Sequence, residues 1–166
     1  DPRGSERSQL TEPTTPPTPE QHADDMHRIL QEFGGGPVDL FASSGALGFE
    51  AASRGAGRVI LIERDRAAID ALEKNRAVLG ATQVDVRRAD ALAWLANSRE
   101  TFDLVFVDPP FDSGLAATVL ADLARHLKAG GQAYIEQATR VIAPAGFIIH
   151  RSGRAGRSHF ALLIKE

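Results

Sequence analysis

The sequence predicts an α/β fold: a doubly wound, mostly parallel sheet with helices on both faces. Short apolar runs, typical of buried strands, alternate with segments of helical periodicity from residue 37 onward. Glycines follow three of the helical segments, where helices commonly end. The chain has 166 residues, of which 43% are hydrophobic and 25% charged, and this is enough for one domain with a sizeable core.

The first 36 residues differ in composition from the rest of the chain. Residues 1–18 are rich in Pro, Thr, Ser and charge, which predicts a flexible tail because such a segment cannot bury enough apolar surface. Thr18, Pro19 and Gln21 form a helix-start pattern, and apolar residues at helical spacing follow it. Residues 19–36 therefore predict an N-terminal helix that ends at a hinge of three glycines. Three arginines against seven acids give residues 1–36 a charge of −4.

Residues 37–166 contain the alternating elements of the predicted domain. Apolar or β-branched runs predict strands over residues 38–42, 59–63, 84–88, 102–107 and 133–136. Helical periodicity between them predicts helices over residues 46–54, 65–79, 91–96 and 115–127. The second of these helices is the clearest, since Ala68, Ile69 and Leu72 share one face and Gly80 follows its end. Residues 147–150 and 159–164 predict a closing antiparallel pair around Ser152-Gly153.

Composition excludes several classes of protein. The absence of cysteine excludes disulfides, thiolate catalysis and cysteine-based zinc sites, and the five histidines lack metal-ligand spacing. There is no run of about 18 apolar residues and no basic-then-apolar signal pattern, so we expect a cytoplasmic protein with no membrane span. The net charge of −3 argues against general nucleic-acid binding. However, five basic residues against one acid give residues 140–166 a charge of +4, where a polyanion is expected to bind unless this is only a solvated basic hairpin.

The loop after the first strand carries a glycine pattern. In sheets of this class, ligands bind at the carboxyl ends of the strands. Here the pattern is nearly G-x-G-x-x-G, with Ser43 where the first glycine would stand. Gly45 would let the backbone approach a ligand, and Gly48 would let the following helix pack closely on the strand. Many strand–helix turns carry two glycines, so this loop alone does not distinguish a nucleotide-binding sheet from other α/β sheets.

Acidic residues follow the next two strands. Glu63 ends the second strand, 18 residues after Gly45, where nucleoside-binding sheets hold the ribose hydroxyls. The alternative is an acid that caps the next helix, a role that Asp65 already fills. Asp90 follows the third strand, where it could either cap a helix or accept a hydrogen bond from an adenine amine, with Ala91 against the ring.

The fourth strand ends in Asp108-Pro109-Pro110-Phe111, which is more than a strand end requires. Two prolines donate no backbone hydrogen bonds and hold φ near about −65°, so the carbonyls around them are rigid acceptors. The Asp108 carboxylate is a further acceptor, and Phe111 offers a face for stacking. The combination predicts a site for an exocyclic amine on a nucleobase.

Four motifs together resemble one family: "DLFASSGALGFEAASRGAGRVILIERD", "DALAWL", "FDLVFVDPPFDSGL" and "GGQAYIE". They resemble the bacterial 16S ribosomal RNA guanine-N2 methyltransferases of the RsmD type, which use S-adenosylmethionine (SAM). The resemblance covers residues 37–166 and implies a seven-stranded sheet with an antiparallel last strand. The chain departs from the family in its short acidic N-terminal part and at Ser43, where glycine is usual. The resemblance assigns the cofactor to Asp39, Phe41, Ala42, Ser43, Gly45, Gly48, Glu63, Arg64, Asp90 and Ala91.

The resemblance also implies a mechanism. The methyl group passes directly to the 2-amino group of a guanine, without a covalent enzyme intermediate, and S-adenosylhomocysteine remains. Asp108 and the Pro109 carbonyl would orient the amine, and Asp108 would accept its proton. Pro110 would stiffen the turn, and Phe111 would stack on a base splayed out of the RNA. The expected partner is 16S rRNA or a small-subunit assembly particle, with the enzyme acting as a monomer and without a metal.

Other functions share part of this evidence. The same site suits adenine N6, cytosine N4 or a protein glutamine amide. Ser43 and the acidic N-terminal part suggest a non-catalytic relic that binds SAM or RNA. An NAD-dependent dehydrogenase is disfavoured, because the loop lacks its first glycine and residues 108–111 would have no role.

Overall fold

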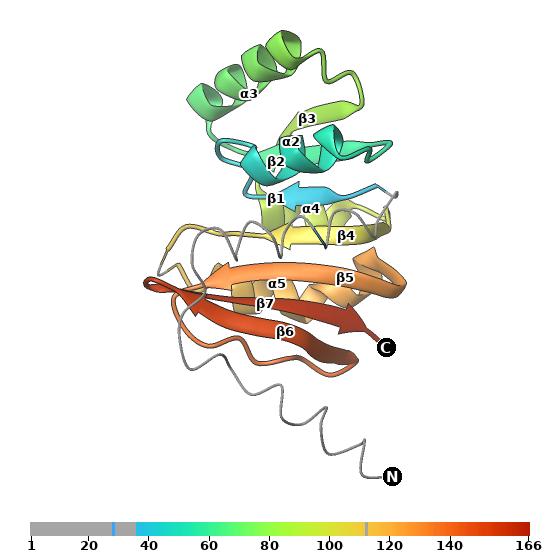
Figure 1. Cartoon of the computed structure of the whole chain (residues 1–166), viewed down its shortest axis with the longest axis vertical. Coiled ribbons are helices and arrows are strands. Elements are labelled where there is room, and N and C mark those ends of the chain that lie inside the picture. The colour runs from blue at the N-terminus through green and yellow to red at the C-terminus, as the bar shows by residue number, and fades with distance from the viewer. Residues whose placement is uncertain (1–27, 29–35, 112) are drawn as a thin grey trace.

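The computed structural model describes Arg28 and residues 36–111 and 113–166; the predicted tail and most of the predicted N-terminal helix lie outside this part. The described residues form one seven-stranded sheet of order β3-β2-β1-β4-β5-β7-β6 (Figure 1). The first five strands pair in parallel, and β7 is antiparallel to both of its neighbours. This confirms the predicted fold class and the antiparallel last strand. The strands are β1 (Val38–Leu40), β2 (Val59–Glu63), β3 (Val84–Arg88), β4 (Phe102–Val107), β5 (Leu127–Gln137), β6 (Phe147–Ala155) and β7 (Ser158–Lys165).

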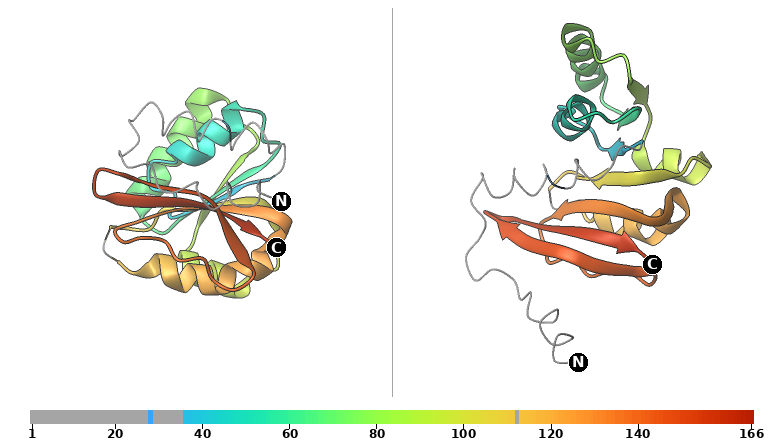
Figure 2. Two further views of the ribbon diagram at one scale, coloured as in Figure 1. Left: turned by 60° about the horizontal axis from the view of Figure 1, so that its bottom comes forward. Right: turned by 45° about the vertical axis from the view of Figure 1, so that its right-hand side comes forward.

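Helices cover both faces of the sheet (Figure 2). α2 (Ala46–Ser53) and α3 (Arg66–Leu79) enclose one hydrophobic core, and α4 (Ala91–Asn97) and α5 (Leu115–Leu123) enclose the other. A 3-10 turn, η3 (Ala124–His126), continues α5. The middle of β2 is fully buried between the two layers: Leu61 packs towards α2 and α3, whereas Ile60 and Ile62 pack towards α4 and α5. This division follows from the alternation of side chains along a strand.

Local signals begin and end the helices that flank the strand ends. The Asp65 carboxylate accepts a hydrogen bond from the backbone N–H of Ala68 and begins α3, and Gly80, at φ 61°, ends it. The Asp90 carboxylate accepts from Ala93 and begins α4. Such a cap stabilises a helix by about 1 kcal/mol. The capping role predicted for Asp65 is confirmed. Asp90 caps α4 through one carboxylate oxygen only, and its other oxygen lies 3.8 Å from the Arg64 guanidinium, so capping does not exclude a second role for Asp90.

The helix predicted over residues 115–127 is too long. α5 ends at Leu123, and β5 already begins at Leu127, so Gly130-Gly131 lies inside a strand rather than after a helix. The cause is tertiary: Lys165 donates from its ammonium group to the carbonyls of Ala124 and Leu127, at 2.7 and 2.8 Å, and turns the chain into the sheet. The strand predicted over residues 133–136 is the central part of the longer β5.

The closing hairpin turns later than predicted. Ser152-Gly153 lies within β6, and the turn between β6 and β7 is at Gly156-Arg157. Gly153 is opposite Phe160, where a Cβ would lie 2.7 Å from the Phe160 ring. The glycine therefore makes room for a cross-strand aromatic ring instead of forming a turn. The first strand is also shorter than predicted, because the chain leaves the extended conformation at Phe41, at φ 63°.

Three ring side chains, from α4, the start of β4 and η3, pack together. Trp94 lies against Phe102 and His126, with ring centroids 5.9 and 6.3 Å away, so it serves as a packing residue. His126 is buried, and its two ring nitrogens lie 3.1 and 2.9 Å from the carbonyl oxygens of Glu100 and Leu95. None of the helices in the described ranges is long and apolar enough to span a membrane.

Candidate active site

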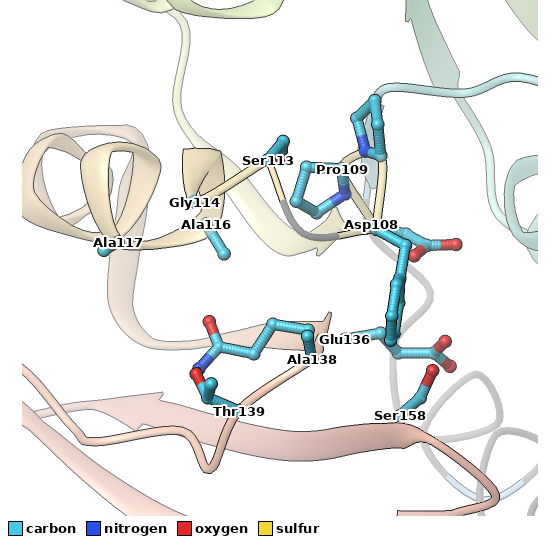
Figure 3. Close-up of a pocket in the computed structure, with 13 residues that line it drawn as sticks. Asp108, Pro109, Ser113, Gly114, Ala116, Ala117, Glu136, Ala138, Thr139 and Ser158 are labelled. Carbon is cyan, nitrogen blue, oxygen red and sulfur yellow. The ribbon is translucent and has the colours of Figure 1, made fainter.

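Two pockets meet at the carboxyl ends of the strands, and they share Asp108, Pro109 and Pro110. The β2-side pocket has a volume of about 390 Å³, and the β5-side pocket about 350 Å³. The other residues of the β2-side pocket are Phe41, Ser43, Ile62, Glu63, Arg64, Ala89, Asp90, Ala91 and Leu115. The other residues of the β5-side pocket are Phe111, Ser113, Gly114, Ala116, Ala117, Glu136, Gln137, Ala138, Thr139 and Ser158 (Figure 3).

The Glu63 carboxylate organises the wall of the β2-side pocket. One oxygen accepts from the backbone N–H of Ser43 at 2.8 Å, and the other accepts from Arg64 and Asp65 at 2.8 and 2.9 Å. The loop after β1 is thereby tied to the end of β2. Carboxylate oxygens have several lone pairs, so Glu63 can still accept from ligand hydroxyls while it holds these amides.

The loop after β1 contains two non-glycine residues in the left-handed region: Phe41 at φ 63° and Ser43 at φ 49°. A side chain there costs roughly 1–2 kcal/mol relative to the right-handed region. Ser43 is the residue that replaces the first glycine of the loop pattern, so the structure explains why glycine would be suited to this position. Strained backbone of this kind is often found at ligand sites.

Replacing Ser43 by glycine should stabilise the protein. We expect Ser43→Gly to raise the free energy of unfolding by about 0.5–1 kcal/mol, because it removes the left-handed strain at some cost in chain entropy. The hydrogen bond to Glu63 comes from the backbone and is kept. Chemical denaturation measures the difference, and Ser44→Gly is the matched control because Ser44 has no positive φ. A loss of stability as large in the Ser43 variant as in the control would contradict this explanation.

Asp39 lies beneath the same loop and is only 2% exposed. Its carboxylate accepts from the backbone N–H of Gly48 at 3.2 Å. Burial raises the pKa of Asp39 to about 8, although the Gly48 hydrogen bond lowers it, and the charges of Asp108 and Glu63 raise it further. The carboxyl group is therefore protonated in the folded protein at neutral pH.

Asp39 should make stability depend on pH. The folded protein keeps this proton up to about pH 8, whereas the unfolded chain releases it near the ordinary pKa of 3.8. The raised pKa of Asp39 therefore contributes fully to the free energy of unfolding below pH 3.8. This contribution declines as the pH rises and is lost above about pH 8. We expect Asp39→Asn to remove this decline, which amounts to at most about 1.4 kcal/mol per pH unit.

Denaturation of wild type and Asp39→Asn across this pH range tests the assignment. The variant should gain stability over wild type as the pH rises, while Asp70→Asn, at an exposed position of α3, should not. A constant difference between wild type and Asp39→Asn would show that Asp39 is already ionised in the folded protein.

Two carboxylates line the β5-side pocket. Asp108 follows β4 directly, and Glu136 lies near the end of the neighbouring β5 (Figure 3). The Tyr134 hydroxyl donates to Glu136 at 2.6 Å. Partial burial of the carboxyl group raises the pKa of Asp108 to about 6, and the charge of Glu136 raises it further. Asp108 is therefore mostly ionised at neutral pH but close enough to its pKa to accept a proton.

Glu136 is a pocket residue that was not predicted from the sequence. The available signal was its position: it is the acid of the "GGQAYIE" motif, close to the carboxyl end of a strand. The pairing of β4 with β5 brings this end next to Asp108.

Phe111 lies at the edge of the β5-side pocket with 47% of its surface exposed. The guanidinium carbon of Arg157, from the turn between β6 and β7, lies 5.1 Å from the centroid of its ring. This is the geometry of a cation–π contact. The predicted stacking surface is therefore accessible from solvent and has a cation beside it.

The structure divides the predicted site residues between the pocket walls and the layer behind them. All four residues predicted as catalytic line the β5-side pocket. Asp39, Ala42, Gly45 and Gly48 do not line either pocket. The remaining residues predicted to bind a cofactor all line the β2-side pocket: Phe41, Ser43, Glu63, Arg64, Asp90 and Ala91.

Gly45 has a packing role in addition to the ligand approach predicted for it. A Cβ at this position would lie 2.5 Å from the Leu72 side chain and 2.8 Å from the Phe49 ring. The space on the Cβ side of Gly45 is therefore filled by the protein's own side chains. Gly48 has the predicted role, since a Cβ there would lie 2.2 Å from the Leu61 side chain.

The β2-side pocket has the groups that a nucleoside cofactor requires. Glu63 and Asp90 can accept from hydroxyl and amine groups, and Phe41, Ile62 and Ala91 supply apolar contacts for a ring. These residues fit SAM. In the described part of the chain, no three His, Asp or Glu side chains are grouped so as to hold a metal ion.

The comparisons with known proteins agree on one family. The family model described as Conserved hypothetical protein 95 matches residues 3–164. Ribosomal RNA small subunit methyltransferase D of Escherichia coli (strain K12) is 37% identical over 134 residues, which cover 78% of this chain and 68% of that protein. The protein of the same name from Buchnera aphidicola subsp. Baizongia pistaciae is 34% identical over 131 residues, which cover 75% and 67%.

Solved structures show the same relationship. The Escherichia coli protein yhhF matches with a TM-score of 0.81 at 33% identity, over 93% of this chain and 91% of that one. The ribosomal protein L11 methylase of Lactobacillus delbrueckii subsp. bulgaricus shares the fold, with a TM-score of 0.70 at 18% identity, over 88% and 80%. The chain therefore belongs to the conserved hypothetical protein 95 family, the family of the ribosomal RNA small subunit methyltransferase D proteins.

Proposed function

We propose that this protein is a SAM-dependent methyltransferase that modifies the exocyclic N2 amine of a guanine in 16S rRNA. The observation that carries the proposal is the junction of the two pockets at Asp108, Pro109 and Pro110. A cofactor in one pocket and a base in the other would meet at this junction. The relatives named for ribosomal RNA methylation support the choice of substrate.

The cofactor belongs in the β2-side pocket. Glu63 would accept from the ribose hydroxyls, Asp90 from the adenine amine, and Phe41 and Ala91 would contact the ring. Arg64, whose guanidinium lies 3.8 Å from the Asp90 carboxylate, would keep that acid oriented. When bound, SAM supplies an electrophilic methyl group on a sulfonium centre.

The β5-side pocket favours guanine over the other bases. The Watson–Crick edge of guanine presents two adjacent donors, N1–H and the 2-amino group, whereas adenine and cytosine each place an acceptor beside their amine. Asp108 and Glu136 are both acceptors when ionised. Two acceptors suit the guanine edge and would repel the ring nitrogen of adenine or cytosine. Glu136 therefore supports guanine N2 among the amines that the sequence leaves open.

Asp108 has the central part in the chemistry of this site. The lone pair of a guanine 2-amino group is delocalised into the ring, which makes the nitrogen a poor nucleophile. Hydrogen bonds from this amine to Asp108 and to the Pro109 carbonyl would hold it with its lone pair turned towards the cofactor pocket. Asp108 would then accept the proton that the nitrogen releases. Pro110 keeps the turn rigid, and Phe111 would stack on the base.

A methyl-transfer assay tests the proposal directly. Labelled SAM and small ribosomal subunits that lack the modification should yield N2-methylguanosine, identified by mass spectrometry of the nucleosides. N6-methyladenosine, N4-methylcytidine or methylated protein would assign the same site to a different amine. Binding of SAM without any transfer would indicate the non-catalytic alternative.

The proposal includes the form in which the protein works. We expect a monomer to be active in the cytoplasm, on free 16S rRNA or on an assembling small subunit. Sedimentation at the enzyme concentrations of the assay measures the oligomeric state. Activity that rises faster than in proportion to the enzyme concentration would instead indicate that a dimer is the active species.

A further inference from the structure

Arg157 places a cation beside the stacking surface of the candidate active site. It lies in the turn between β6 and β7, directly before Ser158, which lines the β5-side pocket. Its guanidinium lies 5.1 Å from the centroid of the Phe111 ring. The hairpin therefore brings a cation to the rim of the pocket, beside the ring on which a base would stack.

The pocket itself is unsuited to a phosphate. Its described lining residues include the two acids Asp108 and Glu136 and no lysine or arginine. A nucleotide combines a neutral base with an anionic phosphate. The base can donate hydrogen bonds to the Asp108 and Glu136 carboxylates, whereas the phosphate is repelled by them. The phosphate of a base inserted into this pocket must stay at the rim, where it needs a cation that the lining does not provide.

Little free energy is needed to replace the contact between Arg157 and Phe111 by a base stacked on the ring. Both side chains are exposed, and a cation–π contact at an exposed site is weaker than the stacking of a base on an aromatic ring. An incoming base can therefore displace the guanidinium from the ring. The displaced group remains on the hairpin, next to the rim.

We propose that Arg157 binds the phosphate of the target nucleotide after the base has displaced its guanidinium from Phe111. The inference rests on the proposed function, in which the substrate is RNA. A guanidinium suits this role because its planar array of N–H donors matches phosphate oxygens. The aromatic contact in the free protein keeps the side chain close to the position where the phosphate arrives. Arg157 is thus a substrate-binding residue, and the chemistry stays with Asp108.

Kinetics and RNA binding at several salt concentrations test this role. For Arg157→Ala we expect KM for the RNA to rise roughly tenfold, with kcat at saturating RNA changed less than about twofold. The slope of log affinity against log salt should fall by about 0.7–0.9, the value for one phosphate contact. Arg157→Lys keeps the charge and should keep the wild-type slope. Arg99→Ala is the matched control, since this exposed arginine precedes β4 and so lies at the amino ends of the parallel strands, whereas the pockets lie at their carboxyl ends.

The outcomes separate this inference from the proposed function. A wild-type KM and salt slope in Arg157→Ala would overturn the inference, and so would an unchanged KM with a large loss of kcat. A slope in Arg157→Lys equal to that of Arg157→Ala would also overturn it. If the wild-type protein binds rRNA but transfers no methyl group, the proposed function fails. Filter binding still tests Arg157 in that case, because the phosphate contact does not depend on turnover.

Discussion

Replacement of Asp108 by asparagine should lower kcat by about 10²–10⁴-fold, the range for the loss of a positioned general base. Asparagine keeps the shape of the side chain but cannot accept a proton at neutral pH. Its amide would also place a donor where the substrate amine needs an acceptor. Single-turnover methyl transfer, with enzyme in excess over RNA, measures this effect without a contribution from product release.

The same variant should change the dependence of the rate on pH. The pKa of Asp108 is raised to about 6, first by burial and then by the charge of Glu136. Below this pH the carboxyl group is protonated and cannot serve as the acceptor, so wild-type activity should fall as the pH falls through about 6. The residual activity of Asp108→Asn should not show this fall. A fall with the same midpoint in the variant would assign the titration to another group.

Stability measurements control for misfolding of the Asp108 variant. Because the raised pKa means that the ionised form is disfavoured in the folded protein, Asp108→Asn should be at least as stable as wild type above pH 6. Asp70→Asn removes the same charge from an exposed position of α3 and should keep full activity. Near wild-type activity in Asp108→Asn would refute the mechanism proposed for this site.

Gly48→Ala should have the largest effect on stability among the substitutions considered. A Cβ at Gly48 would lie 2.2 Å from the Leu61 side chain, 3.2 Å from that of Val59 and 3.5 Å from the Asp39 carboxylate. Leu61 and Val59 are fully buried, so neither has space to move into. We expect the free energy of unfolding to fall by about 1–3 kcal/mol or more, as for other overpacked cores. Guanidinium denaturation measures the loss.

A second glycine in the same region provides the control. Gly57 precedes β2, has no positive φ, and would meet nothing within 4 Å if a Cβ were added. Gly57→Ala should change stability by no more than about 0.5 kcal/mol. Equal losses of stability in the two variants would show that close packing of α2 on β2 is not what requires glycine at residue 48. In Gly48→Ala, the displaced α2 should also weaken the hydrogen bond from Gly48 to Asp39.

The parts of the fold that the sequence predicts well depend on local interactions. The cap at Asp65 and the glycine after α3 involve residues within a few positions of each other, and strand alternation is visible along the chain. The boundaries that were wrong depend on distant residues. Lys165 fixes the start of β5 from about forty positions away, and Phe160 explains why Gly153 is in a strand. Such contacts leave no local pattern in the sequence.

The residues of the candidate site also fall into those that local sequence predicts and those that depend on distant parts of the chain. Residues at or just after the carboxyl end of a strand, such as Glu63 and Asp108, could be predicted because these ends lie together on one side of a parallel sheet. Glu136 required knowledge that β5 is next to β4, and Arg157 required the true position of the hairpin turn. The glycine pattern of the sequence includes Gly45 and Gly48 alike and does not show which side chains surround each of them. The packing constraint at Gly45 becomes visible only when the side chains of Leu72 and Phe49 are placed beside it.

The three hydrogen bonds to Glu63 have a consequence for the dynamics of the β2-side pocket. They fix the backbone amides of Ser43, Arg64 and Asp65 to a side chain at an exposed edge rather than to regular secondary structure. These backbone amides exchange their hydrogens with solvent when the loop opens locally. A ligand that binds the Glu63 carboxylate stabilises the closed loop and slows this exchange. The three amides therefore form a built-in reporter, whose exchange rates follow the occupancy of the pocket without any added label.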